Sequence, residues 1–171
     1  RLISALVLGT LMVMFSACED ASTVLQTRVP KFAYVANAAS NNVLVYSINA
    51  TTGKLTLVDN VAAGDAPNGI AIDPSGKFVY VANIGSDNVY GYSINATTGK
   101  LTLVDNVATG HWPISIAVDP SGKFAYVANQ GGNVSAYTIN ATTGKLTPLS
   151  TGAIVGAGDG PISIVIMGVL Q

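Results

Sequence analysis

The sequence is short of charge and nearly devoid of the residues that most often mark catalytic sites. Only 10% of its 171 residues are charged, whereas soluble domains average about a quarter. Its single cysteine, Cys18, excludes an intrachain disulfide, and it has one histidine, His111. Its two arginines, Arg1 and Arg28, lie near the N-terminus, and its net charge is −1. Nucleic-acid binding needs clustered lysine and arginine, so nucleic acid is excluded as a partner.

What the sequence does contain is an internal repeat of 46 residues. The stretch 77–122 is identical to the stretch 31–76 at 34 of 46 positions, and a third copy begins at Lys123. The copies are rich in β-branched and aromatic residues and are interrupted by Gly, Pro and Asn, which is typical of strands joined by turns. This period lies between those of WD40 and kelch propellers. The sequence therefore predicts an all-β propeller-type protein with repeats at 31–76, 77–122 and 123–171.

Each copy predicts four short strands, as in one blade of a propeller. In strands b and c apolar side chains occupy both faces, as expected of a sheet packed between two others. A DPSG stretch after strand a favours a type I turn, and an NATTG stretch after strand c favours a longer hairpin. For one blade the predicted strands are Gly69–Asp73 (a), at the end of the first copy, and Phe78–Asn83 (b), Asn88–Ile94 (c) and Lys100–Val104 (d), in the second copy.

The repeats amount to about three blades. They predict a b-c-d set, two complete a-b-c-d sets and a final a-like strand at Ile162–Ile166. Three blades cannot close a ring, because propellers use four to eight. Two explanations stay open at this point. Either the chain is a fragment of a seven-bladed protein, or it forms a homodimer that completes a six-bladed ring by exchanging the last strand, a low-cost route to a dimer.

An apolar leader precedes the repeats. Residues 2–15 form an uncharged apolar run that is typical of a signal peptide and short for a membrane span. The FSAC stretch that follows resembles a bacterial lipobox, with Phe15 where Leu is usual, and this resemblance implies lipidation of Cys18. We therefore expect a signal peptide over 1–18, a tether over 19–30, and a lipid-anchored protein of the cell envelope, periplasmic or on the outer surface. An ordinary secretory signal is the alternative.

The repeats resemble a known family. The motifs YVAN after Lys-Phe, YSINATTGKLT and P-x-x-IAIDPSGK are similar to the YVTN-type repeats of the lactonase-like seven-bladed β-propellers, over about Lys31 to Ile166. This family includes 6-phosphogluconolactonase, a cycloisomerase that makes carboxymuconolactone, and surface proteins without known activity. Its enzymes use His, Arg and Glu in their sites, whereas the repeats of this chain carry one His, no Arg and no Glu.

The candidate functional residues come from loops that differ between copies. Six of the 12 mismatches between the first two copies lie in the b–c and d–a connections, which share one end of a blade. Binding residues favour loops on a rigid scaffold. Four rim residues are candidates for ligand binding: Asp65, His111, Trp112 and Asp159.

His111 is the candidate general base, supported by Asp65 or Asp159. A metal site from Asp65, Asp159 and His111 is chemically possible, because the carboxylate oxygens of the two aspartates suit Ca²⁺ or Mg²⁺. They fall on different blades, however, and nothing in the sequence brings them together. We therefore predict no metal and no cofactor.

Two functions follow from these observations. The first is an exported, lipid-anchored propeller that acts as a binding or scaffolding module in the cell envelope, for an unknown protein or small-molecule ligand. The second is a lactonase-like hydrolase that acts on a sugar or dicarboxylate lactone, with His111 as the base. The absence of arginine and glutamate from the repeats favours the first for this chain alone.

Overall fold

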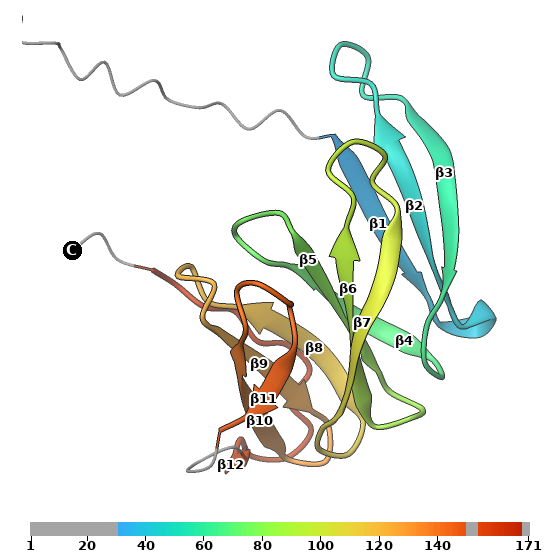
Figure 1. Ribbon diagram of the computed structural model, residues 1–171. Coiled ribbons are helices and arrows are strands. Elements are labelled where there is room, and N and C mark those ends of the chain that lie inside the picture. The colour runs from blue at the N-terminus through green and yellow to red at the C-terminus, as the bar shows by residue number, and fades with distance from the viewer. Residues whose placement is uncertain (1–30, 150–153, 169–171) are drawn as a thin grey trace, which may run out of the picture.

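The computed structural model describes residues 31–149 and 154–168. Within them the chain forms antiparallel strands and one short 3₁₀ helix, η1 (Ala38–Ser40). Figure 1 shows three successive sheets, with the sheet β4–β7 between the other two. The first sheet contains β1 (Phe32–Asn37), β2 (Asn42–Ile48) and β3 (Leu55–Ala62). The second contains β4 (Pro67–Ile72), β5 (Phe78–Asn83), β6 (Asn88–Ile94) and β7 (Leu101–Ala108). The third contains β8 (Pro113–Val118), β9 (Phe124–Asn129), β10 (Asn133–Ile139), β11 (Leu146–Pro148) and β12 (Ile154–Gly156).

The predicted all-β propeller architecture is confirmed, and strands b and c of the second copy have the predicted ends. Strand a begins two residues earlier than expected, at Pro67, and strand d continues four residues further, to Ala108. Strand d can continue because a register shift between Gly91 and Tyr92 keeps β7 paired with β6. Each sequence repeat supplies strands b, c and d of one sheet and strand a of the next.

The middle sheet is buried on both faces because a sheet lies against each of them. All six residues of β5 are buried, whereas the equivalent strand of the first sheet, β1, has none. Val81 is 0% exposed and its counterpart Val35 is 41% exposed. Two apolar clusters fill the junctions on either side of the middle sheet, one containing Tyr80 and the other Tyr92.

Tyrosine hydroxyls join neighbouring sheets at equivalent positions. The Tyr34 hydroxyl donates to the carbonyl of Gly99 (3.1 Å), and one sheet further on the Tyr80 hydroxyl donates to the carbonyl of Gly144 (2.9 Å). Burial raises the pKa of Tyr34 to about 12, so its phenol stays a donor at neutral pH. A second pair of bonds repeats in the same way: Tyr92 hydroxyl to Ala62 carbonyl (2.8 Å) and Tyr137 hydroxyl to Ala108 carbonyl (2.7 Å).

Glycine is required where these hairpins approach the adjacent sheet. Gly99 and Gly144 have φ values of +75° and +73°, in the left-handed region that glycine adopts without a steric penalty. A Cβ atom would lie 2.4 Å from the Phe32 ring at Gly99 and 2.3 Å from the Phe78 ring at Gly144. The hairpin glycines therefore let each phenylalanine pack against the next blade.

Aspartate side chains organise the DPSG turns. The Asp119 carboxylate accepts hydrogen bonds from the backbone amides of Lys123 and Phe124, each at 2.8 Å, and from the backbone amide of Ser121 at 3.0 Å. It also accepts a hydrogen bond from the Ser121 hydroxyl. Burial alone would raise the pKa of Asp119, but these bonds outweigh it and hold the pKa below its ordinary value.

The predicted last strand, Ile162–Ile166, is wrong. The segment lies beside β8, where the Ile164 amide donates to the Ser115 hydroxyl (3.3 Å), but it has no strand assignment. No b strand is available in the described residues to pair with it, and Val165 is 88% exposed. A strand needs a hydrogen-bonded neighbour, so its sequence pattern alone does not make one.

The twelfth strand is β12, which was not predicted. It pairs with one end of β10 while β11 pairs with the other, so the two pieces share the position of a single strand d. Pro148, which has no backbone N–H to donate, is the last residue of β11.

The predicted signal peptide, Cys18 and the tether lie outside the described residues. Among residues 31–149 and 154–168, no helix has the length and apolar character needed to cross a membrane.

Candidate functional site

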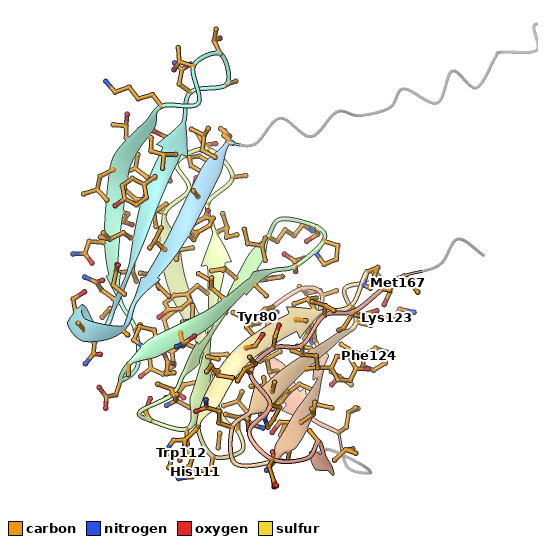
Figure 2. All side chains as sticks on the ribbon, turned by 180° about the vertical axis from the view of Figure 1, so that it is seen from behind. Tyr80, His111, Trp112, Lys123, Phe124 and Met167 are labelled. Atoms are coloured by element: carbon orange, nitrogen blue, oxygen red, sulfur yellow. The ribbon has the colours of Figure 1, made fainter. Side chains whose placement is uncertain are left out.

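The b–c and d–a connections lie at one end of the sheets, where Figure 2 shows His111 and Trp112. We call these connections the rim. It comprises residues 38–41, 63–66, 84–87, 109–112, 130–132 and 157–160.

At the first junction, between the first and second sheets, Asn41 of the β1–β2 connection binds the β3–β4 connection. The Asn41 side-chain amide donates to Asp65 Oδ1 (3.1 Å), and Asn41 Oδ1 accepts from the Ala66 backbone amide (2.9 Å). Asp65 therefore accepts a hydrogen bond from a neutral amide, and this bond joins the β1–β2 and β3–β4 connections. It is not the carboxylate at His111.

At the second junction, between the second and third sheets, Asp87 takes the place of Asn41 and His111 takes the place of Asp65. Asp87 Oδ2 lies 2.6 Å from His111 Nδ1, and Asp87 Oδ1 accepts from the Trp112 backbone amide (2.8 Å). The pair is open to solvent, with side chains that are 59% exposed for His111 and 39% exposed for Asp87. Its position matches the Asn41–Asp65 contact one sheet earlier.

The two changes between the junctions compensate for each other. If only Asn41 had become aspartate, its carboxylate would lie against that of Asp65, and like charges at this distance repel. With His111 in the second position, the contact becomes an attractive acid–base pair. The structure therefore explains two of the mismatches between copies as one joint substitution.

The electrostatics of the pair determine the histidine tautomer. Burial by itself raises the pKa of Asp87, but the Trp112 amide and the His111 side chain outweigh it and lower the pKa below its ordinary value. Asp87 is therefore an ionised acceptor at neutral pH, and His111 Nδ1 must be the donor. This leaves Nε2 of a neutral His111 as a proton acceptor.

Trp112 is held in an unfavourable backbone conformation beside the histidine. Its φ is +58°, uncommon for a bulky residue, and the equivalent Ala66 has a φ of +47°. Its ring stacks on His111 with centroids 4.2 Å apart and planes tilted by 30°. Half of the Trp112 side chain is exposed, so this aromatic surface faces solvent at the rim.

Backbone hydrogen bonds anchor the His111–Trp112 connection to the next sheet. The Gly131 amide donates to the His111 carbonyl (3.0 Å), and the Gln130 amide donates to the Trp112 carbonyl (2.8 Å). A Cβ on Gly131 would lie 3.0 Å from His111 Cβ. The histidine is therefore fixed between two b–c turns.

The remaining predicted rim residue, Asp159, makes no hydrogen bond with this pair. The residue equivalent to Asn41 and Asp87 in the third sheet is Gly132, which has no side chain to hold the connection. Asp159 is exposed and makes no hydrogen bond with another described residue. The supporting role predicted for Asp65 or Asp159 is therefore wrong, because Asp87 occupies the contact position.

Sequence reasoning missed Asp87 as the partner of His111. A signal was present, because positions 41/87 and 65/111 both differ between the first two copies. The sequence could not show that these positions touch, since 24 residues separate Asp87 from His111.

Buried asparagines form the base of the rim. Asn129 Oδ1 accepts from the Thr109 hydroxyl (3.2 Å), whereas the equivalent Asn83 Oδ1 is buried without a partner. The residue equivalent to Thr109 at the first junction is Ala63, which has no hydroxyl to donate to Asn83 Oδ1. Asn88 and Asn133 accept from these two asparagines (2.9 and 2.7 Å) and so stabilise their own turns.

Two hollows lie at the other end of the sheets, away from the rim. One, of about 140 Å³, lies between the second and third sheets beside Asp73, Phe78 and Ile139. The other, of about 340 Å³, occupies the equivalent place between the first and second sheets beside Phe32, Ile72 and Ile94, and its lining is mainly apolar. Neither hollow is lined by a rim residue, and on the described rim His111 is the chemically distinctive group.

No group of three or more His, Cys, Asp or Glu side chains suited to a metal occurs within residues 31–149 and 154–168. The Asp87–His111 pair offers at most two such ligands at the rim.

The three sheets and their rim define part of a β-propeller, and comparison with known proteins identifies the family. A family model described as "Lactonase, 7-bladed beta-propeller" matches residues 6–109 and 69–160, which together cover most of the chain. The chain belongs to the family of seven-bladed β-propeller lactonases. No curated protein matches it.

Solved structures give the same result. A candidate 6-phosphogluconolactonase from Bacteroides fragilis is 27% identical, with a TM-score of 0.72 over 78% of this chain and 38% of its own. Another from Bacteroides uniformis is 26% identical, with a TM-score of 0.70 over 77% of this chain and 39% of its own. The periplasmic gluconolactonase PpgL of Pseudomonas aeruginosa is 21% identical, with a TM-score of 0.68 over 76% and 38%, which shows the fold alone. The chain thus spans under two fifths of the length of these proteins.

Proposed function

We propose that the rim carries a lactone-hydrolysing site in which the Asp87–His111 pair supplies the general base. The observation that supports this most directly is the 2.6 Å contact between Asp87 Oδ2 and His111 Nδ1 on an exposed loop of a lactonase-family fold. A carboxylate that holds the histidine tautomer and stabilises the imidazolium is the arrangement that makes histidine an effective base.

The reaction needs one proton acceptor and one water molecule. His111 Nε2 takes a proton from the water as its oxygen attacks the carbonyl carbon of the lactone. The ring C–O bond then breaks, and the departing oxygen receives the proton back from His111. The product is the open-chain hydroxy acid, and Asp87 stays ionised throughout.

The charge of the rim narrows the substrate class. The described rim residues include no lysine and no arginine, so nothing there balances a phosphate or a second carboxylate. Of the two classes expected from the sequence, a neutral sugar lactone therefore fits better than a dicarboxylate lactone.

The test is hydrolysis of δ-gluconolactone by the chain, followed as proton release above the spontaneous rate. We expect His111→Ala to lower kcat by roughly 100-fold or more, the usual contribution of a general base. Asp87→Asn should lower kcat while leaving KM nearly unchanged, because the tautomer and not substrate binding is altered. Lys54→Ala, at the opposite end of the sheets, is the matched surface control and should keep wild-type rates. No turnover above background, or an unaffected His111→Ala enzyme, would refute the proposal.

A second function, a binding module, is favoured by Trp112. The chain keeps a half-exposed indole where backbone strain disfavours a bulky residue, and exposed tryptophan is typical of contact surfaces. Trp112 is the sole tryptophan, so intrinsic fluorescence reports this site alone. Binding without turnover predicts that a sugar lactone or its hydroxy acid changes the fluorescence while the ligand stays intact. Unchanged fluorescence at millimolar ligand would argue against it.

The location of the protein is also a proposal. The leader supports export to the cell envelope and lipid attachment at Cys18, with secretion as the alternative. Mass spectrometry of the membrane fraction tests this directly, because mature protein with an unmodified Cys18 would exclude the anchor.

A further inference from the structure

All lysines of the repeats lie at the end of the sheets opposite the rim. Each one directly precedes a strand b (Lys31, Lys77 and Lys123) or a strand d (Lys54, Lys100 and Lys145). Both kinds of strand begin at this end, and Figure 2 shows Lys123 well away from His111 and Trp112. We call it the lysine end. It comprises residue 31 and residues 49–54, 73–77, 95–100, 119–123 and 140–145.

The charges of the repeats are divided between the two ends of the sheets. The lysine end carries six lysines and two aspartates, Asp73 and Asp119, which give it a net charge of +4. The described rim carries three aspartates and no lysine or arginine, so its charge is −3 while His111 is neutral. The sequence shows no lysine-rich run, because successive lysines are 22 or 23 residues apart. Only the fold brings them to one surface.

The aspartates of the lysine end do not neutralise the lysines. The Asp73 side chain accepts from the backbone amides of Lys77 and Phe78 (2.8 and 2.7 Å) and is 7% exposed. Asp119 binds its own turn in the same way. All six lysines are exposed, and the one ion pair among residues 31–149 and 154–168 is that of Asp87 with His111. The positive charge of this end is therefore available to a partner.

The leader joins the repeats at this same end. Strand β1 begins at Phe32, so residues 1–30 connect to the sheets through Lys31. Residues 19–30 separate Cys18 from Lys31, and a chain of this length spans roughly 45 Å at most. A membrane that holds Cys18 is therefore nearest to the lysine end. This step rests on the proposed attachment at Cys18, whereas the separation of charges does not.

We propose that the lysine end is a membrane-contact surface for the anionic headgroups of a phospholipid bilayer. Each lysine near such a surface contributes roughly fivefold to partition, and clusters of about four to eight basic residues are typical of anionic-lipid binding. A lipid chain and a basic patch then act as two attachment signals. The acidic rim is repelled by the same surface, so His111 and Trp112 are directed away from the membrane.

Two observations favour a lipid surface and make the proposal independent of blade number. The lysines recur as two per sheet across three sheets, an array that suits a surface better than a single line of phosphates. Further blades would pack against the end sheets and leave the lysine end uncovered.

Three equivalent hairpin lysines provide the test substitution. The side chains of Lys54, Lys100 and Lys145 make no hydrogen bond or ion pair with a described residue, so changing all three to glutamine removes charge without removing a contact. The control is Asp65→Asn combined with Asp159→Asn, which raises the net charge by two at the rim. Asparagine at 65 keeps an acceptor for the Asn41 amide.

The experiment is co-sedimentation of the 171-residue chain, without lipid on Cys18, with phosphatidylcholine vesicles that contain or lack phosphatidylglycerol. The apolar leader is common to all variants, so only the increase caused by phosphatidylglycerol is compared, and circular dichroism confirms folding. We expect an increase of roughly 10-fold or more for wild type and the rim variant, and little for the triple lysine variant. Molar salt should abolish the increase, since it screens charges beyond about 3 Å. Equal increases with and without the three lysines would overturn the proposal, and so would a marked gain in the rim variant.

Orientation is tested with Trp112, the sole tryptophan. Lipids brominated on their acyl chains quench indole only at short range, so Trp112 of the bound protein should keep its fluorescence. Trp112→Phe combined with Thr97→Trp moves the indole to the lysine end, where the same lipids should quench it. Quenching of Trp112, or none at position 97, would refute this orientation.

Nucleic acid is the competing anionic partner. Tighter binding to duplex DNA than to phosphatidylglycerol vesicles at the same salt would overturn the proposal in its favour. None of these measurements uses lactone hydrolysis or a lipid on Cys18. The membrane surface, the hydrolase and the anchor can therefore each fail without the others.

Discussion

Replacing Ala63 with threonine should stabilise the protein, because a buried acceptor at the first junction has no donor. Asn83 Oδ1 is buried and unpaired, whereas Asn129 Oδ1 accepts from the Thr109 hydroxyl at 3.2 Å. The two positions have the same backbone contact, since the amides of Ala63 and Thr109 each donate to the preceding b–c turn (2.9 and 3.0 Å). A threonine at 63 therefore places its hydroxyl near Asn83 Oδ1.

The magnitude follows from the cost of the unpaired group. A buried acceptor without a partner costs about 1–3 kcal/mol, and a typical new hydrogen bond returns about 1 kcal/mol. The gain is reduced by desolvation of the new hydroxyl and by fitting its methyl group. We expect Ala63→Thr to raise the free energy of unfolding by about 1 kcal/mol, or the Tm by roughly 3 °C for a chain of this size. Thr109→Ala should lower the free energy of unfolding by about 1–3 kcal/mol, since it leaves Asn129 Oδ1 unpaired.

The assay is urea unfolding followed by circular dichroism, with the m-value compared to confirm that only stability has changed. Ala63→Val is the matched control, because valine has the shape of threonine without its hydroxyl. If the hydrogen bond is the cause, valine gives no gain and threonine does. Equal effects of the two substitutions would show that packing, not hydrogen bonding, limits this site. A loss of stability with threonine would refute the reasoning altogether.

Two further predictions concern turns. The folded-state pKa of Asp119 lies below its unfolded value near 3.9. Its stabilising contribution is therefore full above the unfolded pKa and is lost as the pH falls from there through the lower folded-state pKa. Asp119→Asn should lose less stability than wild type between pH 5 and pH 3, as measured by urea unfolding, and parallel curves would contradict this. Gly144→Ala should cost more than Gly76→Ala by about 1–3 kcal/mol, because both have positive φ but a Cβ at Gly144 would lie 2.3 Å from the Phe78 ring. Equal Tm losses for the two alanine variants would show that backbone strain alone determines the cost.

Much of the fold could be predicted from the sequence because turn residues in each repeat mark the ends of the strands. Strands b and c of the second copy were predicted with both ends correct, since turn residues border them closely. Strand d was predicted too short because its last four residues, ending at Ala108, are paired through a bulge that no sequence pattern reveals. The segment Ile162–Ile166 has the apolar character of a strand and is not one, because strand formation depends on a neighbour.

The candidate site was predicted in part. His111 and Trp112 stood out as departures from the repeat, and the structure places them together at the rim, stacked and exposed. Asp87, which contacts His111, came from another loop and was not recognised. The assignment of Asp65 to His111 failed because Asp65 is held by Asn41 at the neighbouring junction.

The sequence by itself determined the all-β propeller class, the length of the repeating unit and the location of the variable loops. These properties depend on local turn chemistry and on the alternation of apolar residues, which act over a few residues. Only the tertiary structure decided which loops meet, that Asp87 and not Asp65 contacts His111, and which tyrosine hydroxyls join neighbouring sheets. Such contacts join residues 24 to 65 positions apart, and they depend on how neighbouring sheets stack on one another.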